Sequence, residues 1–595
     1  MSSPTPAVEA PLATRAGVPP AWPADFPAWA KELADLYYTG TTCLFILHGN
    51  VHDLVACPAQ EGSRKFVTAA DFLATHLFGS WDVVMDYDLG SGFRPLVGGD
   101  AKRLQTMQQL LMRQLGPPAA WSRDPDKVLD QVDQLVERAL IEDDPALPRR
   151  MAFLFEHAEY LLPAADLSTL ARGQAARLVR CMGWAQNPYI KRQNMAFCLI
   201  TEKLSEINDR LVQDPHVATI EIPMPDAAAR RTFIEHTIAA DPRIKLGELT
   251  VEAVTQLSSG LNLVSLNVLL AQSGPQGLEL GPFRKLKKAM IERHCQGLVE
   301  FIEPPHTLDL IVGHAAGTAR LKQDSEWIAR GQLDTAPMGY LICGSVGTGK
   351  TFLAECYAGS IGVPCVKLLN FRSKYVGETE GNLEQVLNVL RALGPVIVII
   401  DEADAALGNR EADGDSGTSG RVFSMIASQM GDTRYRGKIV WMLLTCRPDL
   451  LPIDLKRQGR CEVHIPLFPP QTEAEIADMW RVMAKKNKTA LAADALPTVS
   501  PARQLSGADL ESILLGARRR ALLAGRAAIE KSDFVEALDD FIPSAEGLEK
   551  ELQETVAVLE CTDRGFLTAA WRERIAQLDG RAKLQQRVSE LRGLL

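Results

Sequence analysis

The residues with the clearest chemical purpose form the stretch GSVGTGKT, from Gly344 to Thr351. It has the spacing G-x-x-x-x-G-K-[ST] of a loop whose backbone N–H groups bind phosphate. Lys350 would reach the β- and γ-phosphates of a nucleotide, and Thr351 would hold Mg²⁺. The alternative is an ordinary glycine turn, which the flanking sequence disfavours.

Two acids follow about fifty residues later, at the end of VIVIIDEAD (396–404). A continuous apolar run suits a strand that is buried on both faces of a parallel sheet. Asp401 is placed to hold Mg²⁺ through water, and Glu402 is placed to polarise the water that attacks the γ-phosphate. An apolar strand ending in Asp-Glu means little alone, but after a phosphate loop it indicates nucleotide hydrolysis.

The elements beside the loop must hold it at the edge of a sheet. MGYLICG (338–344) predicts a short strand, and TFLAECYAGSIG (351–362) has apolar residues at helical spacing. Strand, glycine loop and helix in this order place a phosphate at the positive end of the helix. We therefore predict an α/β fold with a parallel sheet, and ATP and Mg²⁺ as cofactors.

Length and composition indicate a multidomain globular chain. Its 595 residues suggest three or four domains. The net charge of -10 disfavours a general nucleic-acid binder, although a local basic patch stays possible. Eleven cysteines without a C-x-x-C pair predict a reduced, cytoplasmic chain, and no apolar run has the length of a membrane span. The Pro- and Ala-rich residues 1–28 predict a flexible tail rather than a secretory signal.

Five stretches resemble the AAA ATPases, and specifically the branch that contains katanin, spastin and the valosin-containing protein. The resemblance covers about 301–545. In chain order, the stretches resemble an adenine-contacting segment, a first pore loop, the segment after the Walker B strand, the sensor-1 strand with its arginine fingers, and the sensor-2 region: LDLIVGHAAGTARLK (308–322), SKYVGETEGNL (373–383), DGDSGTSGRVFSMIASQMG (413–431), LLTCRPDLLPIDLKRQGRCEVHIPLFPP (443–470) and LSGADLESILLGARRRAL (505–522).

The resemblance implies a homo-oligomeric ring, usually a hexamer, with ATP between neighbouring subunits. Arg457 and Arg460 occupy the arginine-finger positions, from which a neighbour stabilises charge on the transferring phosphoryl group; otherwise they are two surface arginines. Lys374, Tyr375 and Val376 would line the pore. The implied nucleotide contacts are Val312, Gly313, Gly344, Ser345, Val346, Gly347, Thr348, Gly349, Lys350, Thr351, Phe352, Gly507 and Ala508, with Thr351 and Asp401 holding the metal.

One position departs from the family pattern. The sensor-1 residue is usually Asn, which helps to orient the attacking water, but this chain has Cys446. A thiol is a poor hydrogen-bonding partner. Either Thr445 compensates or hydrolysis is slow, so the substitution concerns the turnover rate and not nucleotide binding.

The first three hundred residues repeat the plan in outline. CLFILHGN (43–50) predicts a strand that ends where a phosphate loop would begin, but VHDLVA follows and no Gly-Lys-Thr. RMAFLFEHAEYLL (150–162) parallels VIVIIDEADAAL, which places Glu156 at the magnesium Asp and His157 at the catalytic Glu. We predict tandem AAA+ modules of which the first has lost its catalysis; the alternative is an unrelated α/β domain.

The predicted organisation has five parts. They are a tail (1–28), a degenerate module (29–300) with a helical insertion at about 100–149 and a lid at about 227–300, an active core (301–471), a helical lid (472–545) and a C-terminal helical extension (546–595). The basic cluster RKLKK (284–288) is read as a solvated helix face rather than a polyanion site. No H-E-x-x-H zinc signature occurs, so we expect no metalloprotease module.

Three functions follow from these features. The first is an ATP-driven remodeller that pulls a protein client into a ring pore, which the pore-loop sequence favours. The second is a nucleotide-switched assembly factor or scaffold with slow hydrolysis, which Cys446 and the degenerate module favour. The third is a nucleic-acid motor or loader, which the acidic charge disfavours.

Overall fold

The computed structural model divides by its contacts into two units, each built on its own sheet. Unit 1 comprises 1–291 and 373–392, and unit 2 comprises 292–372 and 393–595. The structure describes residues 22–58, 64–117, 121–141, 148–165, 168–274, 277–302, 306–361, 363–369, 376–407, 416–542 and 547–595.

The sheet of unit 1 has six strands in the order β5-β4-β6-β7-β1-β8. All neighbouring pairs are parallel except the antiparallel edge pair β4–β5. The central strands are mostly apolar and buried, as expected when helices cover both faces of a sheet. The strands are β1 (Leu44–Gly49), β4 (Val83–Asp88), β5 (Gly92–Pro95), β6 (Arg150–Phe155), β7 (Asn194–Ile200) and β8 (Val217–Ile222), with a separate hairpin of β2 (Leu54–Ala56) and β3 (Phe66–Thr68).

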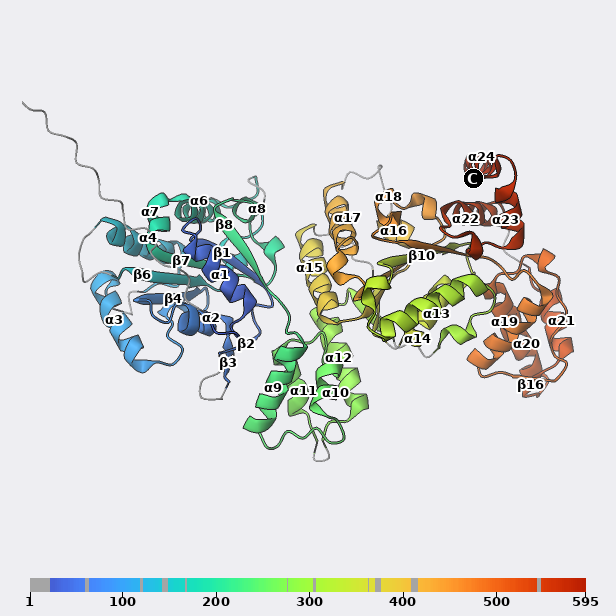
Figure 1. Ribbon diagram of the computed structural model, residues 1–595, viewed down its shortest axis with the longest axis horizontal. Coiled ribbons are helices and arrows are strands. Elements are labelled where there is room, and N and C mark those ends of the chain that lie inside the picture. Colours follow the sequence, from blue (N-terminus) through green and yellow to red (C-terminus); the bar gives the residue numbers. More distant parts are fainter. Residues whose placement is uncertain are drawn as a thin grey trace, which may run out of the picture. The chain divides into compact units, whose positions relative to one another are not determined.

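The helices of unit 1 form two groups, one around the sheet and one that makes a separate four-helix cluster (Figure 1). The first group is α1 (Ala28–Tyr38), α2 (Ala69–Phe72), α3 (Ala101–Leu115), α4 (Pro125–Ile141), α5 (Ala158–Leu161), α6 (Arg172–Gln186), α7 (Pro188–Arg192) and α8 (Asp209–Val212). The cluster is α9 (Ala227–Ala240), α10 (Val251–Leu257), α11 (Leu263–Ala271) and α12 (Leu280–His294). The helix α15 (Val376–Ala392) groups with unit 1, where Gln385 Nε2 donates to Glu202 Oε1 at 2.8 Å.

The sheet of unit 2 has the order β14-β10-β13-β12-β11-β9. The pair β9–β11 at one edge is antiparallel and the other pairs are parallel. The strands are β9 (Val299–Ile302), β10 (Gly339–Gly344), β11 (Cys365–Leu368), β12 (Val396–Ile400), β13 (Ile439–Thr445) and β14 (Val463–Leu467).

The helices of unit 2 flank the sheet, form a lid, or belong to the C-terminal extension (Figure 1). Flanking helices are α13 (Ala315–Ala329), α14 (Lys350–Ile361), α16 (Ala403–Leu407), α17 (Ser416–Met430) and α18 (Ile453–Lys456). The lid holds α19 (Glu473–Lys486), α20 (Gly507–Leu523), α21 (Lys531–Asp539) and the short pair β15 (Ala490–Leu491) and β16 (Ala528–Ile529). The extension holds α22 (Gly547–Glu560), α23 (Ala569–Ala576) and α24 (Gly580–Leu594).

The two sheets share one strand order. Read from one edge, β8-β1-β7-β6-β4 of unit 1 corresponds to β14-β10-β13-β12-β11 of unit 2, in the same sequence order along the chain. Each sheet also ends in one antiparallel strand, β5 or β9. This correspondence confirms the prediction of two tandem α/β modules, each with a small helical domain. Among the described helices, none is both long and apolar enough to span a bilayer.

Candidate nucleotide site of the second module

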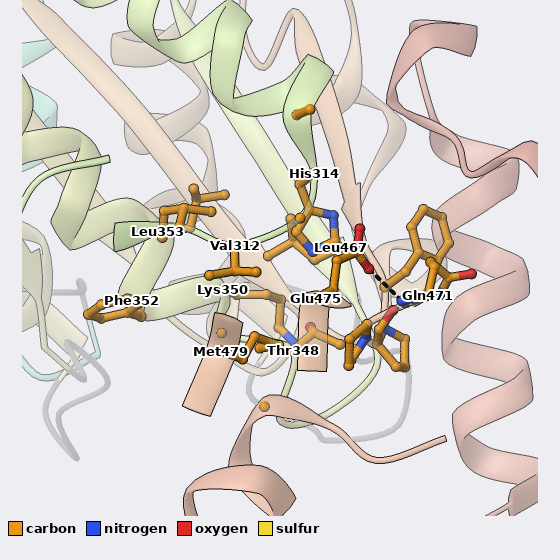
Figure 2. A pocket seen from close by; sticks show the side chains of 18 of the residues that line it. Val312, His314, Thr348, Lys350, Phe352, Leu353, Leu467, Gln471, Glu475 and Met479 are labelled. Carbon is orange, nitrogen blue, oxygen red and sulfur yellow. Dashed lines mark hydrogen bonds between the residues drawn. The ribbon is translucent and has the colours of Figure 1, made fainter. Parts of the chain in front are cut away.

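A cavity of about 960 Å³ lies between the sheet edge and the lid of unit 2 (Figure 2). This volume falls in the range of pockets that enclose nucleotide-sized ligands. Its walls are the segments 310–316, 347–353 and 467–471, five lid residues of α19, the start of α20, and part of the C-terminal extension. The lid residues of α19 are Glu475, Met479, Val482, Met483 and Lys486. The cavity therefore collects segments that are far apart in the sequence around one phosphate loop.

The loop from Gly344 to Gly349 needs its glycines for space as well as for backbone conformation. Gly344 has φ 144°, and a Cβ atom there would lie 2.3 Å from the Leu467 carbonyl oxygen. Gly347 has φ 81°, and a Cβ atom would lie 2.6 Å from Ser506 Oγ. The Gly347 carbonyl oxygen accepts the Ala508 N–H at 3.1 Å, so the lid contacts the loop directly.

Lys350 and Thr351 begin α14 at the end of this loop. The Lys350 ammonium donates to the carbonyl oxygens of Gly344 and Ser345, both at 3.0 Å. Among the described residues no carboxylate forms an ion pair with Lys350, so its charge is available to an anion. A lysine held only by carbonyl dipoles beside the start of a helix fits a phosphate group.

Asp401 lies directly after β12 and joins the loop to the strand next to it. Its Oδ2 accepts hydrogen bonds from Thr351 Oγ1 at 3.2 Å and from Lys367 Nζ at 2.9 Å. The hydroxyl and carboxylate that would hold Mg²⁺ are thus in direct contact. Sequence reasoning missed Lys367, because only the pairing of β11 with β12 brings its side chain to Asp401.

Glu402 and Cys446 lie at the ends of β12 and β13, which are neighbours in the sheet. Glu402 is exposed and directly precedes α16. Thr445 does not stand free beside Cys446: its hydroxyl donates to Asp404 Oδ1 at 2.6 Å and accepts the Arg447 N–H at 2.8 Å. Its hydroxyl proton is therefore already used, which argues against Thr445 as the group that compensates for the missing Asn.

The other end of the cavity is mainly apolar and includes the segment from Val312 to Ala316. Gly313 and His314 both have positive φ (73° and 52°), and this bend starts α13. Burial lowers the pKa of His314 to about 4, against an opposing effect of Glu475, so the imidazole is neutral at pH 7. Phe352 lies below the lid lysine Lys486, whose Nζ is 5.0 Å from the ring centroid. A neutral imidazole beside a partly apolar surface suits a purine base.

The arginine-finger candidates lie outside the cavity. The Arg457 side chain is 60% exposed, whereas that of Arg460 is 14% exposed. Arg460 Nη1 donates to the Asp454 carbonyl oxygen at 2.8 Å. Burial and the charge of Arg457 lower the pKa of Arg460. Of this pair, Arg457 is the more available to a neighbouring molecule.

The predicted pore residues fall at the boundary of the description. Lys374 and Tyr375 lie outside the described residues, and Val376 is the first residue of α15.

Unit 1 holds a different set of groups at the corresponding strand ends. Glu156 follows β6, and the oxygens of Glu156, Asp86 and Asp88 lie within 4.8 Å of one another. The Arg94 guanidinium lies beside these acids: its Nη2 is 2.7 Å from Asp86 Oδ2 and 3.5 Å from Asp88 Oδ2. Burial and the charge of Glu156 raise the pKa of Asp86 to about 6.

Asp53 occupies the turn of unit 1 that corresponds to the phosphate loop. It is 4% exposed, and its carboxylate accepts the N–H groups of Leu263 at 2.9 Å and Val264 at 3.0 Å. These N–H groups belong to the first two residues of α11. A carboxylate of the chain itself therefore caps this lid helix. Sequence reasoning did not find this contact.

The C-terminal extension packs on unit 2, and it also lines part of the cavity, which the sequence did not predict. Gly565 to Ala569 and Arg572 form one wall, next to α13. On the other side, Gln553 and Glu554 of α22 contact Val346 and Ser345 of the phosphate loop.

The comparisons with known proteins agree with this geometry. Residues 340–468 match the ATPase family associated with various cellular activities (AAA). Residues 17–223 match the N-terminal Rossmann-like domain of AAA+ chaperones, and residues 228–296 match their second helical domain. The chain carries AAA+ ATPase domains of the chaperone type. AAA domains use ATP with Mg²⁺. Lys350 and Thr351 line the cavity and Asp401 bonds Thr351, so the lysine, hydroxyl and carboxylate that fit this pair lie together.

Three curated relatives match between 34% and 52% of this chain. An ATP-dependent zinc metalloprotease FtsH 1 from Salinibacter ruber is 28% identical over 275 residues, 44% of this chain and 40% of its own length. The cell division cycle protein 48 homolog from Archaeoglobus fulgidus is 25% identical over 52% of this chain and 46% of its own length. The 26S proteasome regulatory subunit 10B homolog A from Arabidopsis thaliana is 31% identical over 34% of this chain and 51% of its own length. The chain thus spans about half the length of these relatives.

Proposed function

We propose that the second module hydrolyses ATP with Mg²⁺ and that the whole chain uses this reaction to remodel, unfold or disassemble a protein client. The observation that carries the proposal is the contact of Asp401 with Thr351, which lines the cavity under the lid together with Lys350. The AAA family match and the FtsH, CDC48 and proteasome relatives support it.

In this proposal each residue has a defined task. Lys350 and the loop N–H groups would bind the phosphates, and Thr351 and Asp401 would hold Mg²⁺, whose charge would offset that of the phosphates. Glu402 accepts a proton from the attacking water. Lys367 balances the charge of Asp401 before the metal binds. Val312, His314 and the lid helices α19 and α20 exclude water from the purine base of the nucleotide.

We further propose a homo-oligomeric ring, most simply a hexamer, in the katanin, spastin and valosin-containing-protein branch. Arg457 and Arg460 would act on the nucleotide of the neighbouring subunit. Some relatives have names that place them in protein assemblies, such as the 26S proteasome regulatory subunit. These relatives favour the proposed assembly.

The first module is, in this proposal, a non-catalytic scaffold. Arg94 supplies the positive charge among its acids, and Asp53 bonds its lid without a nucleotide. A catalytic lysine is missing from its loop sequence, and His157 is no substitute for a carboxylate base. The domain limits would be those of the sequence prediction, 29–300 for this module and 301–545 for the active one.

A nucleotide-switched assembly factor is the second candidate. Cys446 at the sensor-1 position favours it, because the neighbouring Thr445 hydroxyl already bonds Asp404. Such a protein would bind ATP tightly and hydrolyse it slowly.

Tyr375→Ala separates these two functions. A remodeller that grips polypeptide in a pore through an aromatic ring would keep ATP binding and assembly but lose client-stimulated hydrolysis. Full stimulation by an authentic client in the Tyr375→Ala protein would contradict threading and favour the switch. Lys322→Ala, at an exposed ion pair with Asp309, is a suitable control.

A further inference from the structure

The helix α22 of the C-terminal extension contacts the outer edge of the phosphate loop. Gln553 is 5% exposed, and its Oε1 accepts the Val346 N–H at 3.0 Å. The next residue, Glu554, accepts the Ser345 hydroxyl at 3.3 Å. Two consecutive residues of one helix thus bond two consecutive residues of the loop.

These bonds hold the part of the loop that has the least support of its own. The Val346 side chain is 51% exposed and so contributes little packing. Without Gln553, the Val346 N–H would have no hydrogen-bond acceptor among the described residues. The inner part of the loop is held differently, by bonds of Thr348 and Lys350 to the Ser345 carbonyl oxygen.

The helix itself is firmly placed. Leu552 and Val556 pack against Val588 and Leu591 of α24. Glu560, at the end of α22, pairs with Lys456, and its carbonyl oxygen lies 2.8 Å from His464 Nδ1 on β14. Because α22 is fixed to the sheet and to α24, it can transmit a fixed position to the loop.

The extension also reaches the segment after β13. Arg592 of α24 donates to Asp449 at 2.6 Å, and Asp449 is in turn bonded by Arg447 at 3.0 Å. Arg447 follows Cys446 directly. The same three-helix extension therefore contacts both the phosphate loop and the sensor-1 end of the site.

We infer that Gln553 and Glu554 are positioning residues that hold the phosphate loop in its nucleotide-binding shape from outside. The C-terminal extension thereby supports the nucleotide site and does not only pack against the rest of unit 2. The inference rests on the proposed function for its consequence in catalysis, but the effect on the loop can be measured without it.

The test compares three full-length variants. Gln553→Met keeps the size of the side chain but removes the acceptor, and Gln553→Glu keeps an acceptor at the same place. Glu551→Gln is the matched control on the same helix, because Glu551 pairs with Arg587 of α24 and not with the loop. Thermal unfolding of each variant shows whether it folds.

The first measurement is hydrogen exchange of the loop amides without nucleotide. We expect exchange at 344–349 to be about tenfold faster in Gln553→Met, because one buried bond is lost, and to be unchanged in Glu551→Gln. Partial or full recovery in Gln553→Glu shows that the acceptor matters. Equal exchange in wild type and Gln553→Met overturns the inference, whatever the enzyme activity.

The second measurement is the Kd of MgADP and the KM and kcat for ATP. We expect Gln553→Met to raise Kd and KM roughly five- to tenfold with a smaller change in kcat, since the loop binds phosphate in ground and transition states alike. Absence of ATP binding in the wild type would refute the proposed function, while the exchange result would still decide the role of Gln553. A Kd unchanged in Gln553→Met would overturn the inference.

Discussion

His157 and Glu402 have the same backbone conformation at corresponding places in the two modules. Each is the second residue after its strand, β6 or β12, and directly precedes a short helix, α5 or α16. Their φ angles are 54° and 47°, in the left-handed region that residues with a Cβ rarely adopt. The first module thus has the same costly bend as the second, where it holds the carboxylate that we propose as the base, but carries an imidazole there. The shared bend supports a common architecture of the two modules, and the different side chains indicate that their chemistry differs.

Lys350→Ala should remove all tight nucleotide binding from the full-length protein. The reason is that Lys350 is the cation of the second loop and the first module has no equivalent. Isothermal calorimetry with ATP and Mg²⁺ should show no saturable heat. Residual micromolar binding would reveal a working site in the first module and contradict its scaffold role.

Lys367→Met should change the metal requirement of the second module. Lys367 and the metal that we propose at Asp401 would compete for its carboxylate, because Nζ bonds the carboxylate oxygen at 2.9 Å. We expect the half-saturating Mg²⁺ concentration for hydrolysis to fall several-fold at fixed ATP concentration. Lys322→Met, which breaks an exposed pair with Asp309, is the control. An unchanged Mg²⁺ titration would mean that Lys367 does not oppose metal binding.

Asp53→Ala should loosen the lid of the first module. Two N–H groups at the start of α11 lose a buried charged acceptor, which costs about 2–3 kcal/mol. We expect faster hydrogen exchange at 263–266 and a lower melting temperature. Asp226→Ala removes an exposed helix cap of α9 and serves as the matched control, with a cost of about 1 kcal/mol. Equal effects of the two variants would argue against a special role of Asp53.

Much of the second module could be predicted because its signals are local. The run from Gly344 to Thr351, with a strand before it and a helix after it, fixes the site within a few residues of sequence. The strand order of the first module was also predictable in outline, because its apolar runs follow the order of the second.

The remaining site residues depend on tertiary structure. Lys367 is one polar residue in a strand, and only the neighbouring strand explains it. Gln553 and Glu554 belong to an ordinary polar helix about two hundred residues from the loop that they bond. Asp53 caps a helix that begins 210 residues later. None of these positions has a local pattern that distinguishes it from a surface residue.

Asp86→Asn should reduce the pH dependence of the stability of unit 1. The pKa of Asp86 is raised to about 6 in the folded state from 3.8, so its contribution to stability is full below pH 3.8 and is lost as the pH rises through 6. The loss is at most about 3 kcal/mol. We expect the melting temperature of wild type to fall between pH 5 and pH 7 and to level off above pH 7, and that of Asp86→Asn to fall less.

Asp88→Asn is the matched control for this titration. Burial opposes the shift, but hydrogen bonds from Ser91 and Gly90 hold the pKa of Asp88 below its ordinary value. Asp88 therefore stays charged between pH 5 and pH 8, and its removal should lower the melting temperature by a constant amount. Parallel pH curves for wild type and Asp86→Asn would refute the role given to Asp86.

Glu402→Gln provides the most direct test of the central claim, that the second module hydrolyses ATP with Glu402 as the base. The amide keeps the shape of the side chain but cannot accept the proton from water. We predict a Kd for ATP within about twofold of wild type and a kcat lower by about 10²- to 10⁴-fold. Hydrolysis at the wild-type rate in purified Glu402→Gln protein would contradict the account.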